Sequence, residues 1–543
     1  MIKNIKIRVR PEVWCDAQKL ESELAQQNAI SPKSLRGYRI LHSSIDARQR
    51  QVMIQLDLDV YINEEPPQTL FEPKEYREVK GDRQAVVVGL GPGGLFAALK
   101  LIELGIRPIV IERGRNVSDR RRDVAQITRR QEVDPESNFC FGEGGAGAFS
   151  DGKLFTRSKK RGNVSGVLER LCQFGADTGI LDAAHPHIGT DRLPAVIANI
   201  RNEILRCGGE IHYETVVNRL LLKGSQVVGV GTNRGEEFLG PVILATGHSA
   251  RDVYRMLYSE HIPIEKKGLA MGVRLEHPQQ LIDQIQYHNK AGRGPYLPAA
   301  AYSFVAQCNQ RGVYSFCMCP GGVVVPSATG PQQVVVNGMS ASARASRWAN
   351  AAMVVEIRPE DMGELLSEGI CEELPTCTFL DAMGETLTAD SPLVAMALQE
   401  NIERNSWLNG GQKQVAPAQR MLDFVKGRLS ADLPATSYTP GVLASPLHFW
   451  LPRFISTRLR SGFDVFGHSA HGFLTNDAVL IAAETRTSSP VRIPRDRDSL
   501  CHPVIAGLYP CGEGAGFAGG IVSAAMDGER CAEALASQCS CRE

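Results

Sequence analysis

The sequence has no excess of either charge and no long apolar run. Lys plus Arg and Asp plus Glu both number 60 in 543 residues, so composition gives no global argument for nucleic acid or an acidic membrane surface as a partner. No stretch reaches the about 18 uncharged apolar residues that a membrane-spanning helix needs. The start, "MIKNIKIRVRPEVWC", lacks the continuous apolar segment of a secretory signal. We therefore expect a cytoplasmic protein with no membrane partner.

The sequence also lacks any pair of C-x-x-C elements, although it contains 14 cysteines. A structural zinc site therefore has no support, and we expect no bound metal. In the cytoplasm the thiols are expected to be reduced and mostly buried as small hydrophobic groups. His185 and His187 in "HPH" form a single proline-split pair without a carboxylate partner, which is a weak metal signal, so we interpret this segment as loop structure.

A chain of this length is expected to form two to four folding units, because a single hydrophobic core stops growing well before it. Strand-like "IKIRV", a helix over 13–27 and two later strands suggest a small ferredoxin-like βαββ unit, followed by a charged linker punctuated by prolines. The predicted fold class is α/β, with a Rossmann-like domain into which an α+β domain is inserted. The expected boundaries are 1–80 for the unit and linker, 81–267 and 461–543 for the two parts of the Rossmann-like domain, and 268–460 for the inserted domain.

The segment "VVVGLGPGGLFAALKLIELGIRPIVIERG", residues 86–114, reads as strand, glycine-rich turn, helix and strand. Gly89, Gly91 and Gly94 fit G-x-G-x-x-G: the first permits the tight turn, the second admits a pyrophosphate, and the third lets helix and strand pack closely. Free N–H groups and the dipole at the helix start favour an anion. Glu112 ends the second strand, where it can accept hydrogen bonds from ribose hydroxyls. This pattern predicts a dinucleotide site.

Three further segments favour FAD over NAD. "VILATGHSA" places Thr246 and Gly247 at the end of a strand that follows a β-meander, where the chain of a flavoprotein leaves its FAD domain. "YPCGEGAGFAGGIVSAAMDG" supplies Gly512 and Glu513 for the ribityl and pyrophosphate region. It then opens a second helix, whose start can stabilise negative charge on the reduced flavin.

The third segment, "FGEGGAGAFSDGKL", is a second glycine-rich loop long enough to wrap the flavin. An NAD dehydrogenase does not need a glycine motif near its C-terminus. An FAD-binding protein does, because FAD is a longer ligand. The residues expected to bind FAD are Gly89, Gly91, Pro92, Gly93, Gly94, Glu112, Arg113, Gly144, Gly145, Ser150, Lys153, Val217, Thr246, Gly247, Gly512, Glu513, Gly519, Gly520 and Ile521.

Several motifs together carry a resemblance to a known family. They are "GLGPGGLFAAL", "FGEGGAGAFSDGKL", "PHIGTD", "ILATGHSARD", "GVRLEHPQ", "SFCMCPGG" and "CGEGAGFAGGIVSAAMDG". They resemble the bacterial family described only as FAD-dependent dehydrogenases or oxidoreductases, which has a distinctive C-terminal domain, and more distantly the glutathione-reductase type of FAD fold. The resemblance spans nearly the whole chain from about residue 80. It implies bound FAD and a redox reaction, and leaves the substrate open.

A second fingerprint and a disulfide centre are both disfavoured. Gly229, Gly231 and Gly235 have the wrong spacing and are followed by a strand, so we interpret them as a hairpin turn. One dinucleotide site remains, which leaves NADH or NADPH as a transient electron donor. Flavin disulfide reductases use C-x-x-x-x-C, but only Cys140 stands in the corresponding region.

Two C-x-C pairs remain. We expect the side chains of Cys317 and Cys319 to lie on opposite faces of a strand, which disfavours a disulfide. Cys539 and Cys541 are interpreted as incidental thiols of the C-terminal tail rather than a redox pair.

No residue stands out as a general acid or base. His248 and Arg251 follow the strand end at Gly247, where they could orient substrate or stabilise reduced flavin; capping of the next helix and pairing with carboxylates fits them equally well. In the inserted domain the candidates for binding an anionic substrate are Arg274, His277, His448 and Arg453.

The leading hypothesis is an FAD-dependent oxidoreductase that exchanges hydride or electrons with a small molecule bound between the two large domains. A basic cluster in the N-terminal unit raises the alternative of a flavin-dependent RNA-modifying or RNA-associated protein. The cluster comes without aromatic stacking residues, so we favour a solvated or docking face over nucleic acid. A flavin-bound sensor without turnover is a third hypothesis, and the oligomeric state stays open. The cluster consists of Lys33, Arg36, Arg39, Arg48 and Arg50.

Overall fold

The computed structural model of the chain describes residues 1–156 and 162–540. The N-terminal unit is an antiparallel sheet in the order β1-β3-β2, with β3 between the two other strands, as in half of a ferredoxin-like fold. Its helix is shorter than predicted, because Asp16 accepts hydrogen bonds from the N–H groups of Gln18 and Lys19 and so starts a new helix after a break. The elements are β1 (Ile2–Val9), α1 (Pro11–Trp14), α2 (Ala17–Gln27), β2 (Leu35–Asp46) and β3 (Met53–Ile62).

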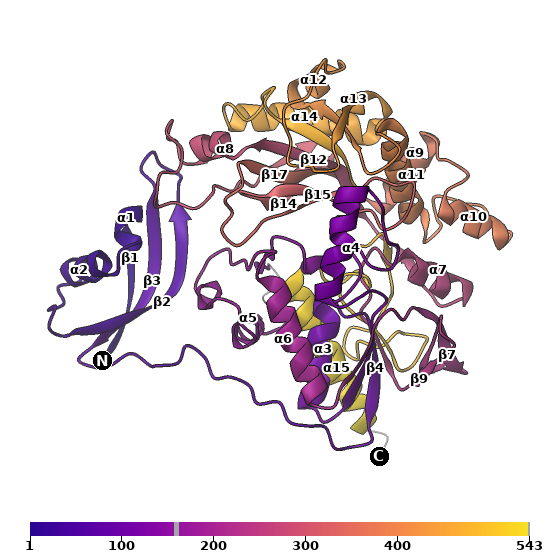
Figure 1. Cartoon of the computed structure of the whole chain (residues 1–543), viewed down its shortest axis with the longest axis horizontal. Helices are drawn as coiled ribbons and strands as arrows, with labels where there is room; N and C mark the ends of the chain where they lie inside the picture. The colour runs from indigo at the N-terminus through magenta and orange to yellow at the C-terminus, as the bar shows by residue number, and fades with distance from the viewer. Residues whose placement is uncertain (157–161, 541–543) are drawn as a thin grey trace.

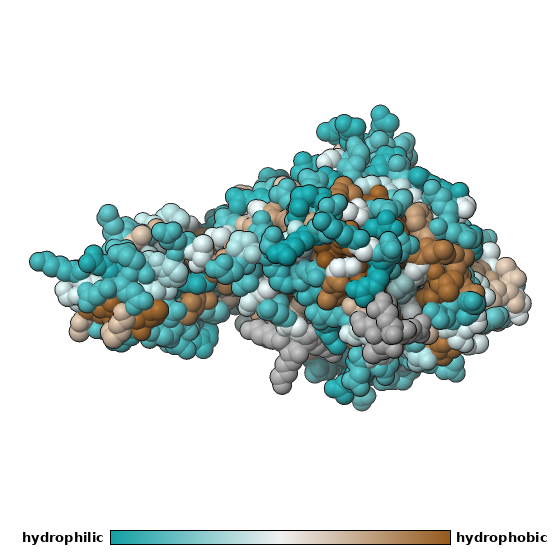
Figure 2. Space-filling view, turned by 90° about the horizontal axis from the view of Figure 1, so that it is seen from below, coloured by the Kyte–Doolittle hydropathy of each residue, from teal (hydrophilic) through white to brown (hydrophobic). Residues whose placement is uncertain are grey.

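The N-terminal unit forms a separate lobe beside the body of the molecule. The predicted linker, residues 63–84, contains no helix or strand before β4 (Gln84–Val88) begins at residue 84, and it runs along the body as an extended trace (Figure 1). Seen from below, the lobe projects to one side of the body (Figure 2). It touches the body through a bridge between Ser43 and Ala183 and a hydrogen bond from Ser43 N to Asp182 O at 2.8 Å.

A five-stranded parallel sheet forms the centre of the first large domain, in the order β22-β10-β4-β5-β6. Its strands are short apolar runs with both faces covered, as a parallel sheet requires. The C-terminal strand therefore lies two places from the strand of the fingerprint, although they are more than 400 residues apart in sequence. The strands are β4 (Gln84–Val88), β5 (Arg107–Ile111), β6 (Glu210–His212), β10 (Val242–Leu244) and β22 (Leu508–Pro510).

Helices α3 and α15 pack against each other beside this sheet, with α6 alongside α3 (Figure 1). The predicted hairpin turn at Gly235 is confirmed, because β8 and β9 pair antiparallel in the meander β7-β8-β9. The remaining elements are α3 (Pro92–Glu103), α4 (Val117–Arg130), α5 (Val164–Gln173), α6 (Leu193–Arg206), β7 (Val217–Lys223), β8 (Gln226–Thr232), β9 (Glu237–Leu239), α7 (Arg251–Ser259) and α15 (Ile521–Ser540).

The second large domain is built on a seven-stranded sheet in the order β13-β14-β17-β12-β20-β18-β19. Only β18 and β19 are parallel; every other pair is antiparallel, as an α+β domain predicts. The strands are β12 (Leu269–Pro278), β13 (Val305–Cys308), β14 (Arg311–Cys319), β17 (Trp348–Ile357), β18 (Ala416–Arg420), β19 (Val442–Ala444) and β20 (Val479–Glu484).

Helices α12, α13 and α14 lie over the top of this sheet in Figure 1. The accompanying elements are β11 (Glu265–Lys266), α8 (Gln279–Gln286), β15 (Val323–Pro326), β16 (Val336–Met339), α9 (Met362–Ser367), α10 (Pro375–Ala382), α11 (Val394–Asn409), α12 (Met421–Lys426), α13 (Leu447–Trp450), α14 (Arg453–Ser469) and β21 (Val491–Arg492).

The second domain extends beyond residue 460, where the sequence analysis ended it. Residue 460 falls inside α14, and β20 pairs with β12 and β18 in the middle of the seven-stranded sheet. The apolar run of β20 suits either sheet, so its pattern alone does not tell which one it joins. The predicted fold class is confirmed: an α/β domain with a parallel sheet, an inserted α+β domain and a small N-terminal unit. Among the helices that the structure describes, none has the length and apolarity to cross a membrane.

Candidate functional site

The glycine-rich turn between β4 and α3 leaves no room for side chains at two of its glycines. Gly89 has φ +98°, and a Cβ there would lie 2.8 Å from the carbonyl oxygen of Ala245. A Cβ on Gly94 would lie 1.9 Å from the carbonyl oxygen of Gly89. Gly91 is the N-cap of α3, and no side chain caps this helix start. The N–H groups of its first turn are thus available to an anion.

Glu112 is buried at the end of β5 and holds two loops against the sheet. Its carboxylate accepts hydrogen bonds from the N–H groups of Leu90 at 2.8 Å, Gly114 at 2.9 Å and Gly142 at 3.0 Å. A carboxylate has about four lone-pair positions, so one remains for a further donor. Its predicted bond to a ribose hydroxyl stays a prediction, to which the structure adds a role in shaping the turn.

The second glycine-rich loop, residues 142–153, lies across the starts of both α3 and α15. A Cβ on Gly145 would lie 3.2 Å from the Cα of Gly91. One on Gly147 would lie 3.3 Å from the side chain of Ile521 and 3.6 Å from that of Pro92. The loop therefore connects the first turn of one helix with the first turn of the other.

Within this loop, the predicted cofactor residue Ser150 has an internal role. Its hydroxyl donates to the carbonyl of Gly147 at 2.8 Å and accepts from the N–H of Gly152 at 3.0 Å. Arg113 is likewise committed to its neighbours, to Glu136 at 2.7 Å and Asp252 at 2.8 Å. Both side chains shape the surroundings of the turn.

The C-terminal motif packs tightly against the segment that follows β10 and against the start of α3, and is open elsewhere. A Cβ on Gly514 would lie 1.8 Å from the carbonyl oxygen of Thr246, and one on Gly528 would lie 2.0 Å from that of Gly93. By contrast, a Cβ on Gly247 or Gly512 would meet nothing within 4 Å. The open space beside the backbone at Gly247 and Gly512, together with the uncapped start of α3, suits a long anionic nucleotide such as FAD. The chain thus fits the cofactor that its sequence predicts.

Two titratable groups stand at this open region. Desolvation raises the pKa of Glu513 to about 8, against the opposing effect of Lys267. Desolvation, together with the charges of Arg486 and Arg251, lowers the pKa of His248 to about 3. At neutral pH His248 is therefore an uncharged imidazole and the Glu513 carboxyl is largely protonated.

Arg251 is held in a buried ion network rather than left for a substrate. Its guanidinium donates to both carboxylate oxygens of Glu403, at 2.7 and 2.9 Å, and to Gln399 at 3.1 Å. Arg486 binds the same carboxylate at 2.9 and 3.0 Å. The structure favours the structural interpretation of Arg251, which ties α7 to α11.

Lys153 leaves the second glycine-rich loop and points to the sheet of the second domain. Its Nζ lies 3.1 Å from Asp151, 3.5 Å from the Sγ of Cys319 and 3.9 Å from the Sγ of Cys317. The expectation that the two thiols lie on opposite faces is wrong, because both sulfurs lie within 3.9 Å of the same ammonium group. Sequence reasoning missed this cluster, although "CMCPGG" at a strand end was among the motifs it singled out.

The four candidates for an anionic substrate are divided between the core and the surface. Arg274 is fully buried, with its Nε 3.1 Å from Glu484, and His277 is buried with its Nε2 2.8 Å from the carbonyl oxygen of Phe473. His448 and Arg453 instead line a groove of about 430 Å³ beside α13 and α14. Val217 is buried at the start of β7, apart from these four.

The two histidines considered for metal binding contact other groups in the structure. The ring of His185 lies 4.9 Å from that of Phe155, and the Nε2 of His187 lies 3.2 Å from the carbonyl oxygen of Ser342. In the described part of the chain, Cys511, Asp527 and Cys531 come together as a possible ligand group. However, Asp527 is paired with Arg495 at 2.7 and 2.9 Å and accepts from the N–H of Gly512 at 2.8 Å.

Two other predicted features lie away from this site. In the N-terminal unit, Arg48 pairs with Asp46 at 2.8 Å and Arg39 donates to the carbonyl of Leu70 at 2.8 Å, so these two cations of the basic cluster have partners within the chain. The side chain of Cys539 and all of Cys541 lie outside the described residues, and the prediction about them stays open.

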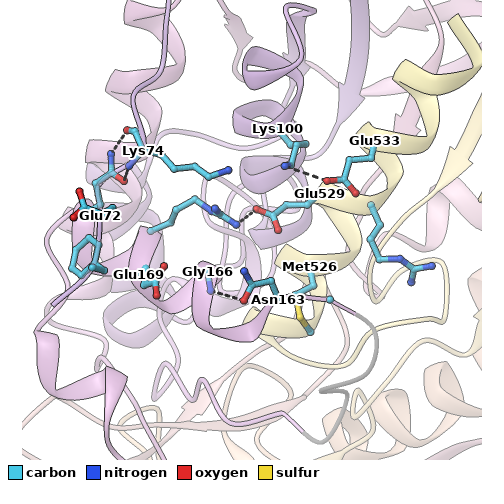
Figure 3. Close-up of a pocket in the computed structure, with 14 residues that line it drawn as sticks. Glu72, Lys74, Lys100, Asn163, Gly166, Glu169, Met526, Glu529 and Glu533 are labelled. Carbon is cyan, nitrogen blue, oxygen red and sulfur yellow. Dashed lines mark hydrogen bonds and ion pairs between the residues drawn. The ribbon is translucent and has the colours of Figure 1, made fainter. Parts of the chain in front are cut away.

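A groove of about 420 Å³ between the linker, α5 and α15 is separate from the predicted cofactor site (Figure 3). Its walls are charged, with Lys100 paired to Glu533 at 3.2 Å and Arg170 paired to Glu529. None of the residues predicted to bind FAD lines it. The groove is therefore not part of the predicted cofactor site.

Comparisons with known proteins support FAD as the cofactor. A family model described as "FAD-dependent protein, C-terminal domain-like" matches residues 268–487, and one described as "Domain of unknown function (DUF8436)" matches residues 1–61. An uncharacterised protein of Clostridium beijerinckii is 38% identical over 537 residues, which is 95% of this chain and 96% of that protein. The relationship therefore extends through all the domains described above.

Solved structures resemble the chain only remotely. A geranylgeranyl bacteriochlorophyll reductase-like protein from Thermoplasma acidophilum is 11% identical, with 85% of this chain and 80% of that chain covered and a TM-score of 0.35. CtdE, solved in complex with FAD and a substrate, is 11% identical, with 84% and 81% covered and a TM-score of 0.30.

Proposed function

The chain belongs to the family of FAD-dependent proteins that share this C-terminal domain, with FAD as its cofactor, and we propose that it is a cytoplasmic oxidoreductase acting on a small molecule. The proposal places the diphosphate of FAD at the start of α3 and the flavin ring near the start of α15. The substrate would bind between the two large domains.

One observation carries this proposal: the two helix starts lie side by side although they are far apart in sequence. Helices α3 and α15 touch at Gly93 and Gly528, and the loop at Gly147 contacts the first turn of each. A single extended dinucleotide explains why both starts are glycine-lined and joined by a third glycine-rich segment. A nucleotide bound at α3 alone would need only the first of them.

The bound flavin supplies the hydride or electron transfer, while the chain binds, orients and shields it. The N–H groups at the start of α3 stabilise the diphosphate charge. The neutral carboxyl of Glu513 is able to donate a hydrogen bond at neutral pH, and the neutral imidazole of His248 adds no charge to the cavity. Neither group is assigned the role of the catalytic acid or base.

The experiment is to purify the protein, release its chromophore by denaturation and identify it, and then screen NADH, NADPH and candidate acceptors anaerobically by flavin absorbance. We expect about one FAD per chain, bleached by a reductant and restored by an acceptor. A colourless protein that takes up no FAD would overturn the proposal. Flavin that no donor except dithionite reduces would favour a sensor instead. RNA binding that weakens steeply with salt would favour the RNA-associated alternative.

A further inference from the structure

The strand that carries Cys317 and Cys319 is distorted where the two thiols lie. In the register of β14 with β17, Phe316 pairs with Ala352 and Cys319 pairs with Asn350, so β14 contains one extra residue. Cys317 lies in this bulge with φ +47°, in the left-handed region that non-glycine residues seldom adopt. Bulges and such backbone strain concentrate at functional sites.

Two cations hold this pair. The Nζ of Lys153 lies 3.9 Å from the Sγ of Cys317 and 3.5 Å from that of Cys319, so both sulfurs lie beside one ammonium group. Arg274 donates to the carbonyl of Cys317 at 3.1 Å, and the thiol of Cys319 donates to the same carbonyl at 3.3 Å. Two free thiols therefore lie beside the positive charge of Lys153, which is a typical environment of a reactive cysteine.

The surroundings make the two thiols unequal. The side-chain interaction with Cys319, aided by the charges of Lys153 and Arg274, lowers the pKa of Cys317 well below that of an ordinary thiol. The same interaction between the two thiols, together with burial, raises the pKa of Cys319. Cys317 is half-buried and Cys319 is buried. This is the division expected of an attacking thiolate and its resolving partner.

Another thiol of the same sheet shows the contrast. Cys308, at the end of β13, is buried, and burial raises its pKa. Among the hydrogen bonds of the described residues, its sulfur accepts none from a lysine, unlike the sulfurs of Cys317 and Cys319. Cys308 is therefore a matched internal control.

The pair lies on the flavin side of the second domain. Lys153 belongs to the loop that crosses the starts of α3 and α15, and its backbone bridges to that of His187. The charge of Cys317 also contributes to the raised pKa of Glu513 in the C-terminal glycine motif. The loop that connects the two helix starts thus places the ammonium group of Lys153 beside the two sulfurs.

We propose that Cys317 and Cys319 are a reversible dithiol–disulfide couple that exchanges two electrons with the bound flavin, an inference that rests on the proposed function. In the oxidising direction the Cys317 thiolate and the Cys319 thiol form one S–S bond, and the S–H bond of Cys319 breaks. Two electrons and the proton of Cys319 pass to oxidised FAD, which becomes the reduced anion. The reverse step regenerates the dithiol from reduced FAD.

The first test is a thiol measurement. Cleavage after Arg311 and Arg344 releases a peptide, residues 312–344, in which these are the only cysteines. The air-oxidised holoprotein is alkylated under denaturing conditions before and after anaerobic reduction, and the peptide is weighed. We expect no alkyl group on the peptide before reduction and two afterwards, with Cys308 alkylated in both samples. Two alkyl groups on the peptide before reduction would overturn the inference.

The second test counts electrons. In an anaerobic dithionite titration, wild type should take up twice as many electrons per FAD as Cys317→Ser or Cys319→Ser, whereas Cys308→Ser should match wild type. Equal uptake by wild type and the two variants, with FAD bound in all, would overturn the inference and leave the proposed function intact. A protein without FAD would overturn both and is recognised first by its missing flavin absorbance.

Lys153→Gln tests the positioning role of the ammonium group. At pH 7 the alkylation rate of Cys317 in the reduced protein should fall roughly tenfold or more, because the thiolate fraction drops as the pKa returns toward that of an ordinary thiol. An unchanged rate would remove Lys153 from the account. The wild-type mass measurement stands even if one of these variants fails to fold.

Discussion

Gly528→Ala perturbs the crossing of α3 and α15, on which the shared site depends. Helix propensity alone makes this change stabilising by about 1 kcal/mol, because Gly528 lies inside α15. However, the added Cβ would lie 2.0 Å from the carbonyl oxygen of Gly93 and 3.1 Å from the backbone nitrogen of Ala97. These are backbone atoms, so no side chain can rotate away, and one helix must retreat by about 1 Å to reach ordinary contact.

Overpacking of this kind costs about 1–3 kcal/mol, and contact with backbone places it at the upper end. After the propensity gain, the net loss is about 2 kcal/mol. If the loss falls on the folded protein as a whole, it appears in the free energy of unfolding. If the free protein relaxes and only the FAD-bound form needs the close crossing, the loss appears as an FAD dissociation constant raised about 30-fold.

The assay measures both quantities, by denaturant unfolding of the apoprotein and by quenching of flavin fluorescence on binding. Gly363→Ala is the matched control: it lies in α9, is exposed, and its Cβ would meet only the Ala389 Cβ at 3.8 Å. This control should be neutral or slightly stabilising and should leave FAD affinity unchanged. A Gly528→Ala protein as stable as wild type, with the same FAD affinity, would refute the reasoning about the crossing.

Three other changes test the electrostatics. Glu403→Gln leaves the buried Arg251 and Arg486 without a counter-charge and should lower the free energy of unfolding by about 3–5 kcal/mol, so a variant as stable as wild type at pH 7 would contradict this prediction. Because the pKa of Glu403 is depressed in the folded state, the stability that Glu403 contributes should be complete above about pH 4.3 and should be lost as the pH falls further. Because the pKa of Glu513 is raised in the folded apoprotein, the folded state binds a proton that the unfolded state releases. Wild type should therefore lose stability relative to Glu513→Gln as the pH rises toward about 8, with no further loss at higher pH. Stability–pH curves of the two proteins that run parallel would argue against the raised pKa. His248→Asn should leave the shape of the pH profile of flavin reduction between pH 5 and 8 unchanged, since the imidazole is already neutral there; loss of an ionisation near pH 6.5 would give His248 a proton-transfer role.

Local patterns predicted the first large domain well, because its key element is contiguous in sequence. Strand, glycines, helix and Glu112 follow one another within residues 86–114, and each requirement concerns neighbours in the chain. The sequence analysis placed the C-terminal motif beside these elements because FAD is a long ligand that needs a second contact region. The parallel pairing of β22 with β10 agrees with that reasoning.

The contacts that sequence did not predict are long-range. The sequence analysis ended the second domain at residue 460 and so left β20 in the first domain. The place of β20 in the second sheet depends on its pairing with β12, about 200 residues earlier. The assignment of Arg251 depends on Glu403 in a helix of another domain. The thiol cluster depends on a bulge in β14 and on Lys153 from a distant loop, neither of which leaves a periodic signal.

The most direct measurement is an experimental structure of the protein with FAD bound. The account predicts one FAD whose diphosphate lies at the N–H groups following Gly91 and whose flavin ring lies at the start of α15, near Ile521. Density that places the diphosphate at α3 but the flavin ring away from α15, or FAD in any other cavity, would contradict it.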